Sequence, residues 1–364
     1  MTIRISSAGD ADTALLIDLV STMSISGSEH LATQRFVSHA VERGFTAEID
    51  SAGNACAHRG RHDADTHIVM LGHIDTVPGD IPVRVSDGVL HGRGSVDAKG
   101  PLCAMLCAAE HATLPSGVRL SVIGAVGEEI TESPGARFLV KTYRPDACII
   151  GEPSGWDGVT LGYKGRLIAR ATAECPNHHS AGSDASAGDA IFAWWQRVTE
   201  HVIAFNADPR GAFDSLQATL QDLGYFCDGL QQYARLDVGF RLPPALHPDT
   251  VADWVAACAR DPVTVGIVGT EVAHQTSRND PVVRSLSSAI RSAGGRPRPK
   301  LKTGTADFNV VGPAWNCPIA AYGPGDSSLD HTPTERLVLD EYHRSINILR
   351  HALETLAVEL TEAG

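Results

Sequence analysis

The 364-residue sequence predicts an α/β protein in two parts, a larger domain with a mainly parallel sheet and a smaller inserted α+β domain with an antiparallel sheet. Up to about residue 164, short apolar runs alternate with segments of helical periodicity, which is the order of βαβ units. From there to about residue 274, longer segments alternate apolar and polar residues, as half-buried antiparallel strands do. We therefore expect the larger domain at residues 1–164 and 275–364 and the inserted domain at residues 165–274.

The elements of the larger domain follow from the spacing of its apolar residues. Residues 12–24 and 30–44 carry apolar side chains at helical intervals, so two helices are expected there. Continuous apolar runs predict buried strands, which helical segments separate. The strands are expected at residues 68–71, 119–126, 147–150 and 319–322, and the further helices at residues 100–111, 134–143, from about 280, and 340–360.

The inserted domain shows a different order. Residues 166–173 and 231–242 alternate apolar and polar side chains, which predicts two strands, and a third strand is expected at residues 263–272. Helices are expected at residues 188–203 and 248–260. Strands before and after each helix predict a small antiparallel sheet that two helices cover.

Composition and charge argue against several classes of function. The chain has 43 Asp and Glu against 30 Lys and Arg, so no nucleic-acid partner is expected, because such binding needs a basic footprint. No apolar stretch reaches the roughly 18 residues that a membrane span needs. The eight cysteines form no Cys-x-x-Cys pair, and the first residues show no signal-peptide pattern. We therefore expect a cytoplasmic protein with reduced thiols and no membrane partner.

The segment His73-Ile74-Asp75 directly follows the apolar run at residues 68–71. In an open α/β sheet, ligand and catalytic groups collect beyond the carboxyl ends of the strands. Residues two apart on an extended chain point the same way. Asp75 can therefore accept the proton of one ring nitrogen of His73 while the other nitrogen faces a metal.

Four further segments place carboxylates or an imidazole at predicted strand ends or in loops. Asp97 precedes a predicted helix and could simply be its N-cap, and His331 could belong to a turn. The adjacent Glu128 and Glu129 could be solvated surface. Glu152, however, closes a buried strand, and strand after strand ends in such a residue, which packing alone does not require.

The combination of residue types indicates a metal site. Two histidines and three carboxylates without cysteine suit Zn²⁺, with Co²⁺ or Mn²⁺ as alternatives. Five ligands exceed the three that a catalytic zinc normally takes, and they match two divalent ions that share one carboxylate. The remaining carboxylate, Glu128, could then accept the proton of an attacking water as general base.

These segments resemble the M20 family of co-catalytic metallopeptidases and deacylases over essentially the whole chain. The matching segments are GHIDTVPG (72–79), GRGSVDAKGPL (92–102), GEEITESPGAR (127–137), GEPS (151–154), HS (179–180) and GPGDSSLDHTPTE (323–335). The resemblance implies an aminopeptidase-like catalytic domain with an inserted lid domain, and a homodimer that forms through the lid.

The resemblance also implies roles for individual residues. In the metal centre, Asp97 would bridge the two metals, Glu129 and His331 would bind one of them, and His73 and Glu152 would bind the other. Glu128 would act as the general base, and Asp75 would orient the ligands. A lid histidine is expected to donate a hydrogen bond to the oxyanion. His179 is preferred because it precedes serine, and the adjacent His178 is the alternative.

Two segments narrow the range of substrates that we expect. Residues 95–101 and 162–166 are similar to deacylases of lysine and arginine biosynthesis, above all those that release lysine or ornithine from an amino-group carrier protein. The substrate would then be an amide between the amino acid's α-amino group and the γ-carboxyl of the carrier's C-terminal glutamate. Such carriers are acidic, so a basic rim is expected at the active-site mouth. The candidates for this rim are Arg93, Lys99, Lys164, Arg166 and Lys302.

Three residues are expected to bind substrate. Gly304, in a Gly-rich turn, would permit close backbone approach, and Asn309 would orient a polar group of the substrate. Arg278 is expected to bind the free α-carboxylate, since a guanidinium binds carboxylates bidentately. Other functions stay open: a small-molecule deacylase acting on N-acetylornithine, N-acetylcitrulline or N-succinyl-diaminopimelate, and a dipeptidase or aminopeptidase. A non-catalytic binding protein is disfavoured, because it would not need Glu128.

Overall fold

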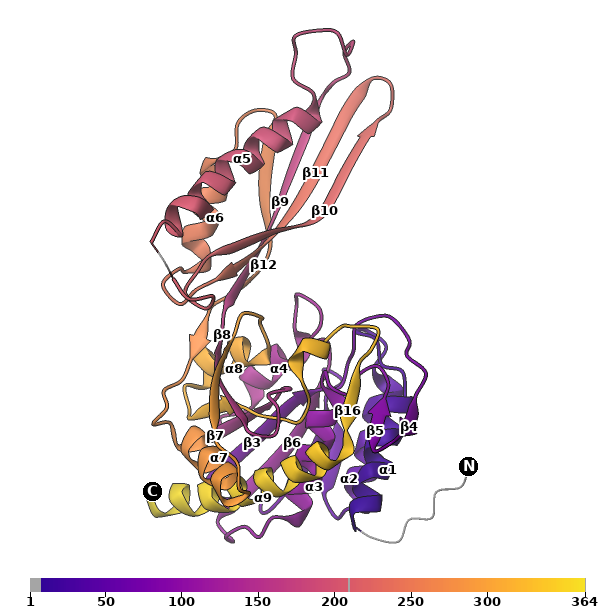
Figure 1. The fold of residues 1–364 in the computed structure, drawn as a ribbon, viewed down its shortest axis with the longest axis vertical. Helices are drawn as coiled ribbons and strands as arrows, with labels where there is room; N and C mark the ends of the chain where they lie inside the picture. The colour runs from indigo at the N-terminus through magenta and orange to yellow at the C-terminus, as the bar shows by residue number, and fades with distance from the viewer. Residues whose placement is uncertain (1–7, 209, 364) are drawn as a thin grey trace. The chain divides into compact units, whose positions relative to one another are not determined.

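The computed structural model describes residues 8–208 and 210–363 and divides into two compact units (Figure 1). Unit 1 consists of Met1–Gly162, Thr276–Leu301 and Val310–Gly364, and unit 2 of Tyr163–Gln275 and Lys302–Asn309. The segment that contains Gly304 and Asn309 thus groups with unit 2.

A mixed sheet forms the centre of unit 1. Its strands β3 (Thr66–His73), β6 (Val118–Ala125), β7 (Ala147–Gly151) and β15 (Ile319–Ala321) pair in parallel in the order β6-β3-β7-β15. Antiparallel strands flank them, namely β1 (Thr46–Ile49) and β2 (Ala55–Arg59) beside β6, and β8 (Gly158–Tyr163) beside β15, with β14 (Arg298–Lys302) paired to β8. The mainly parallel centre confirms the predicted fold class.

Helices pack against this sheet and complete the hydrophobic core of unit 1. The central one, α3 (Lys99–His111), is apolar on every side and packs between the sheet and α9 (Leu339–Ala363), as a fully buried helix should. The other helices of unit 1 are α1 (Ala8–Ser21), α2 (His30–Glu42), α4 (Pro134–Thr142) and α7 (Pro281–Ser292), whereas α8 (Asp307–Trp315) begins in the segment that groups with unit 2. A small separate sheet has the order β16-β5-β4, with β4 Arg84–Ser86, β5 Val89–His91 and β16 Arg336–Val338.

Unit 2 is an antiparallel sheet with two helices on one face (Figure 1). Its strand order is β10-β11-β9-β12, with β9 Gly165–Pro176, β10 Gln217–Cys227, β11 Gln231–Leu242 and β12 Val263–Glu271. The helices are α5 (Ala187–Phe205) and α6 (Pro248–Ala257), and the short β13 (His274–Gln275) ends this part of the chain. Every second residue of β9 is buried in the unit's core, which includes Leu167, Ala169, Ile191 and Trp194.

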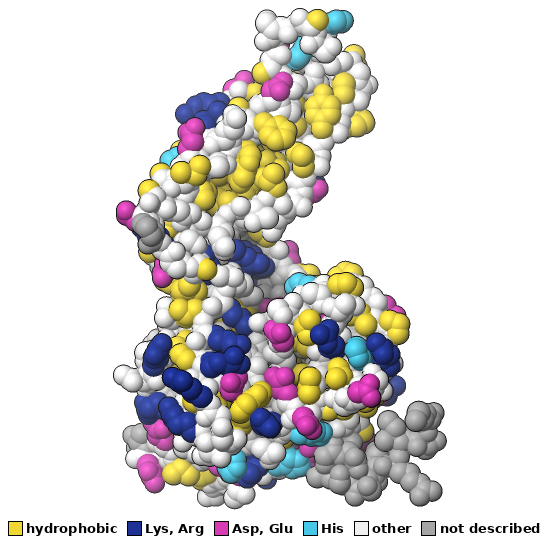
Figure 2. All heavy atoms as spheres, in the orientation of Figure 1, with side chains coloured by type: hydrophobic (Ala, Val, Ile, Leu, Met, Phe, Trp, Pro, Cys, Tyr) yellow, Lys and Arg dark blue, Asp and Glu magenta, His cyan; other side chains and the backbone are white. Residues whose placement is uncertain are grey.

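The edge strand β10 was not predicted from the sequence. Most of its residues are exposed, so it lacks the alternation of buried and exposed positions that reveals a half-buried strand. Its exposed side chains include Leu220, Leu223, Tyr225 and Phe226. Figure 2 shows hydrophobic side chains at the surface over β10 and β11.

The topology of unit 1 brings several loops together at one edge of its sheet. Because β3, β6 and β7 are parallel, the segments that follow His73, Ala125 and Gly151 all leave from the same edge. These segments carry Asp75, Glu128 and Glu129, and Glu152. No helix among residues 8–208 and 210–363 is both long and apolar enough to cross a membrane.

Candidate metal centre

Asp97 lies between two histidines. His73, the buried last residue of β3, has its Nε2 3.1 Å from Oδ1 of Asp97 and 3.9 Å from Oε1 of Glu152. The other oxygen of Asp97, Oδ2, lies 3.0 Å from Nε2 of His331. That nitrogen also lies 3.0 Å from Oε2 of Glu129. Each oxygen of the Asp97 carboxylate therefore faces one imidazole, which in turn lies near a second carboxylate.

The donor set fits divalent cations. Ligand atoms of His73, Asp97 and Glu129 lie within 4.8 Å of one another, and they are imidazole nitrogens and carboxylate oxygens. Hydrogen bonds to Asp97 and Glu129 raise the pKa of His331 to about 10. Burial alone would lower the pKa of His73, yet Asp75 and Asp97 hold it well above its usual value. The negative field that causes both shifts favours a cation between these side chains.

Asp75 positions both His73 and the loop after β6. Nδ1 of His73 lies 3.0 Å from the backbone oxygen of Asp75, which can only accept, so in the neutral ring Nε2 presents its lone pair to the cluster. The buried Asp75 carboxylate accepts hydrogen bonds from Ser26 Oγ (2.7 Å) and from the backbone N–H groups of Glu128 (3.0 Å) and Glu129 (3.1 Å). Burial acts to raise the pKa of Asp75, but the nearby imidazole of His73, whose Nδ1 lies 3.5 Å from Oδ1 of Asp75, and the hydrogen bond from Ser26 leave that pKa below its usual value.

Glu335 holds the loop that carries Asp97, a role that the sequence analysis missed. Its fully buried carboxylate accepts hydrogen bonds from the backbone N–H groups of Val96 (2.9 Å) and Asp97 (3.1 Å), and it pairs with Arg93 at 2.7 Å. Glu335 closes the matched segment at residues 323–335, so its place in that motif was the available signal.

Two lysines that were expected at a basic rim are buried instead. Nζ of Lys99 donates to the backbone oxygens of Leu19 (3.0 Å) and Thr22 (2.6 Å), and Nζ of Lys164 donates to that of Ala212 (2.9 Å). Burial lowers the pKa of each lysine to about 8. The prediction that these two residues supply a basic rim is therefore wrong, because their ammonium groups satisfy main-chain oxygens.

Two further candidates lie in unit 2. His179 is exposed in the loop after β9, where its Nδ1 accepts a hydrogen bond from the N–H of Ala181 at 3.1 Å. Asn309 is buried, and its side-chain amide donates to the backbone oxygens of Lys164 (3.1 Å) and Val272 (2.7 Å). The side-chain amide of Asn309 thus ties the start of α8 to these two main-chain segments.

His178, Gly304 and Arg278 are the remaining candidates. His178 has its Nδ1 3.4 Å from the backbone oxygen of His179. In the described part of the chain, nothing lies within 4 Å of the position that a Cβ of Gly304 would take. Arg278 is exposed and lines a groove on unit 1. The binding roles of Gly304, Asn309 and Arg278 stay predictions.

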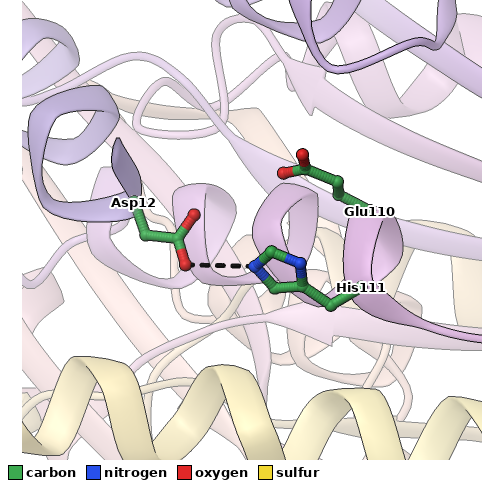
Figure 3. A group of neighbouring side chains, drawn as sticks. All are labelled: Asp12, Glu110 and His111. Atoms are coloured by element: carbon green, nitrogen blue, oxygen red, sulfur yellow. Dashed lines mark hydrogen bonds and ion pairs between the residues drawn. The ribbon is translucent and has the colours of Figure 1, made fainter. Parts of the chain in front are cut away.

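A second cluster of metal-type side chains is an ion-pair network (Figure 3). Ligand atoms of Asp12, Glu110 and His111 lie within 4.8 Å of one another, and Nε2 of His111 lies 3.2 Å from Oδ2 of Asp12. The guanidinium of Arg43 lies 3.0 Å from Oδ1 of Asp12, contacts Glu110 and donates to the backbone oxygen of Ala11. Because one guanidinium already pairs with both carboxylates, we interpret this cluster as a tie between α1, α3 and the end of α2.

Arg43→Met is expected to lower the free energy of unfolding by about 3 kcal/mol or more, because it leaves the buried carboxylate of Asp12 without its cation. The side chains of Arg43 and Asp12 are only 11% and 6% exposed. Urea denaturation measures the loss, with Arg35→Met as control. Arg35 pairs with Asp18 but is 49% exposed, so its loss should stay below about 1 kcal/mol. Equal losses in both variants would contradict this interpretation.

Comparison with known protein sequences gives three findings. The family model described as Peptidase family M20/M25/M40 matches residues 69–355. A Deinococcus radiodurans protein named LysW-lysine hydrolase is 47% identical over 351 residues, which cover 94% of this chain and 96% of the relative. A Thermococcus kodakarensis protein, provisionally named LysW-lysine/LysW-ornithine hydrolase, is 40% identical, with 93% and 90% covered.

Comparison with solved structures finds proteins of the same fold. The M20 family metallo-carboxypeptidase Sso-CP2 from Sulfolobus solfataricus matches with a TM-score of 0.78 at 16% identity, and the match covers 95% of this chain and 99% of that one.

Proposed function

Because the chain belongs to Peptidase family M20/M25/M40, which confirms the resemblance of its motifs, we propose that it is a two-metal amidohydrolase that releases lysine or ornithine from an amino-group carrier protein. Family membership and the hydrolase names of its relatives make it a metal-dependent amide hydrolase. The observation that carries the two-metal proposal is the position of Asp97, whose two oxygens face the imidazoles of His73 and His331.

Five residues would hold the metals. His73 and Glu152 would bind one ion and Glu129 and His331 the other, with Asp97 shared between them. Zn²⁺ is the preferred ion, and Co²⁺ and Mn²⁺ are the alternatives. When bound, such ions supply Lewis acid chemistry, which polarises the substrate carbonyl and makes water acidic near neutral pH.

The protein's own side chains would carry the proton and stabilise the developing charge. Glu128 takes a proton from the attacking water and delivers it to the leaving amine. Asp75 supports this step, because its carboxylate accepts the backbone N–H of Glu128 at 3.0 Å and so fixes the residue's position. His179, or His178 in its place, donates a hydrogen bond to the oxyanion of the tetrahedral intermediate.

The substrate proposal rests on the names of the relatives and is tested by a comparison of substrates. We expect the purified enzyme to hydrolyse carrier-linked lysine with a kcat/KM at least about 100-fold above that for N-acetylornithine, because interactions with the carrier would add transition-state binding. Lysine release measured by chromatography gives both values. Turnover of N-acetylornithine, N-acetylcitrulline, N-succinyl-diaminopimelate or a dipeptide, without turnover of the carrier conjugate, would contradict the proposal.

A homodimer through unit 2 is a further part of this proposal. The exposed apolar side chains of the edge strand β10, among them Leu223 and Phe226, support it. We expect a solution mass of twice the chain mass of 38.5 kDa, as measured by light scattering, and a single chain mass would contradict the dimer.

A further inference from the structure

Two main-chain segments of unit 1 stay paired beyond the ends of their strands. We call them the Glu152 loop, residues 152–156 after β7, and the Gly-Pro-Gly segment, residues 323–325 after β15. Two hydrogen bonds of 3.0 Å join them, from the N–H of Ser154 to the oxygen of Gly323 and from the N–H of Gly155 to the oxygen of Gly325. The Glu152 loop therefore depends on the Gly-Pro-Gly segment for its position.

Glu341 accepts one further N–H from each of these segments. It lies in the first turn of α9, the yellow C-terminal helix of Figure 1. Its Oε1 lies 3.0 Å from the backbone nitrogen of Trp156, at the end of the Glu152 loop, and 3.0 Å from that of Gly325. Within residues 8–208 and 210–363, these two N–H groups have no other acceptor. One carboxylate oxygen thus ties both segments to α9.

Further contacts of Trp156 fix the end of the Glu152 loop. The guanidinium carbon of Arg344, also on α9, lies 4.4 Å from the centroid of the Trp156 ring, which is the geometry of a cation–π contact. The backbone oxygen of Trp156 accepts a hydrogen bond from Oη of Tyr322 at 2.8 Å. A Cβ at Gly295 would lie 2.6 Å from the ring, so the turn after α7 packs closely against it. The loop is therefore anchored four residues after Glu152.

The Gly-Pro-Gly segment also packs directly against Glu152. A Cβ at Gly323 would lie 2.9 Å from the backbone oxygen of Glu152 and 2.6 Å from Cβ of Pro101. The segment thus fits between α3 and the main chain of Glu152, a residue that is only 7% exposed. Glu341, which holds this segment, therefore fixes Glu152 from a second direction.

Two other carboxylates around the candidate metal centre serve the main chain in the same way. Asp75 accepts the N–H groups of residues 128 and 129, and Glu335 accepts those of residues 96 and 97. Like Glu341, each of these acids takes two N–H groups from segments that carry or adjoin a proposed metal ligand. A carboxylate that fixes such a loop before the ion arrives removes the need for the loop to reorder when the ion binds.

We propose that Glu341 is a positioning residue that holds Glu152 ready for its metal ion. This inference rests on the proposed function, in which Glu152 and His73 bind one of two ions. Loss of the Glu341 carboxylate would leave two N–H groups without their acceptor and let the Glu152 loop reorder, so the ion at Glu152 and His73 would be bound more weakly. The other ion should change little, because its ligand loops are held by other carboxylates and, at residues 326–332, by main-chain hydrogen bonds of their own.

The test compares Glu341→Ala with Glu341→Gln. Alanine removes the acceptor, whereas glutamine keeps Oε1 and can still accept both N–H groups. The matched control is Glu354→Ala, which removes another carboxylate of α9, one that accepts the N–H of Thr113 at 3.0 Å outside both segments. Titration of each metal-free protein with Zn²⁺ gives the dissociation constants of both ions, and urea denaturation without metal shows whether each variant is folded.

We expect Glu341→Ala to bind one of the two ions about tenfold or more weakly, because removal of a residue that supports a metal ligand has an effect of this size. Glu341→Asp, which withdraws the acceptor by one methylene group, should show a smaller loss at the same ion. Glu341→Gln and Glu354→Ala should bind both ions within about threefold of the wild type. Wild-type affinity in Glu341→Ala or Glu341→Asp, or a loss in Glu341→Gln or Glu354→Ala equal to that in Glu341→Ala, would overturn the positioning role.

Anomalous scattering at the zinc edge shows which ion is affected. Crystals of Glu341→Ala and of the wild type are equilibrated with the same limiting Zn²⁺ concentration. We expect the peak at His73 and Glu152 to lose occupancy in the variant, relative to the peak at Glu129 and His331. An unchanged ratio of occupancies, or a loss at the other peak, would overturn the proposal. A wild-type protein that binds a single zinc ion would instead refute the proposed two-metal site, and the positioning role with it.

Discussion

Glu128→Gln is expected to lower kcat by about 10²- to 10⁴-fold with the metal content unchanged, because an amide cannot accept the proton of the attacking water. The substitution preserves the size of the side chain. The backbone N–H of Glu128 can still donate to Asp75, so the loop should keep its position. Initial rates on carrier-linked lysine and elemental analysis of the purified variant measure the two quantities.

The control for this variant is Glu132→Gln, the same chemical change at an exposed residue of the same loop. Its kcat should remain within about twofold of the wild-type value. A Glu128→Gln enzyme that retains its metals and wild-type kcat would refute the role of Glu128 as general base.

Asp97→Asn should have the second large effect, the loss of metal together with activity. Removing a residue that only hydrogen-bonds to a metal ligand typically lowers metal affinity by about 10- to 100-fold. The loss of the charge that faces both imidazoles should therefore cost more than about 100-fold, and kcat should fall to background. Titration with Zn²⁺ measures the affinity. The neighbouring Asp326→Asn, which alters an exposed N-cap, should bind metal as the wild type does. Wild-type affinity in Asp97→Asn would contradict the shared position of Asp97.

Part of the cluster lies where predicted strands end. His73 and Glu152 follow or close apolar runs that are visible without a structure, and parallel strands bring their carboxyl ends to one edge. The structure brings these residues together with Asp97, Glu129 and His331. The spacing of apolar residues could not reveal Glu335, because its partners at residues 96 and 97 lie far away in the chain.

The burial of individual charged residues could not be predicted from the sequence either, because their partners also lie far away in the chain. The ammonium group of Lys99 is satisfied by oxygens at the end of α1, about which the residues around Lys99 carry no local signal.

The most direct test of the central claim, that Asp97 is shared between two ions, is a crystal structure of the protein prepared with Zn²⁺. Anomalous scattering at the zinc edge locates each ion independently of the protein coordinates. We predict two peaks about 3.5–4 Å apart, with one oxygen of Asp97 toward each peak, His73 on one and His331 on the other. A single peak, or two peaks of which only one contacts Asp97, would contradict the account.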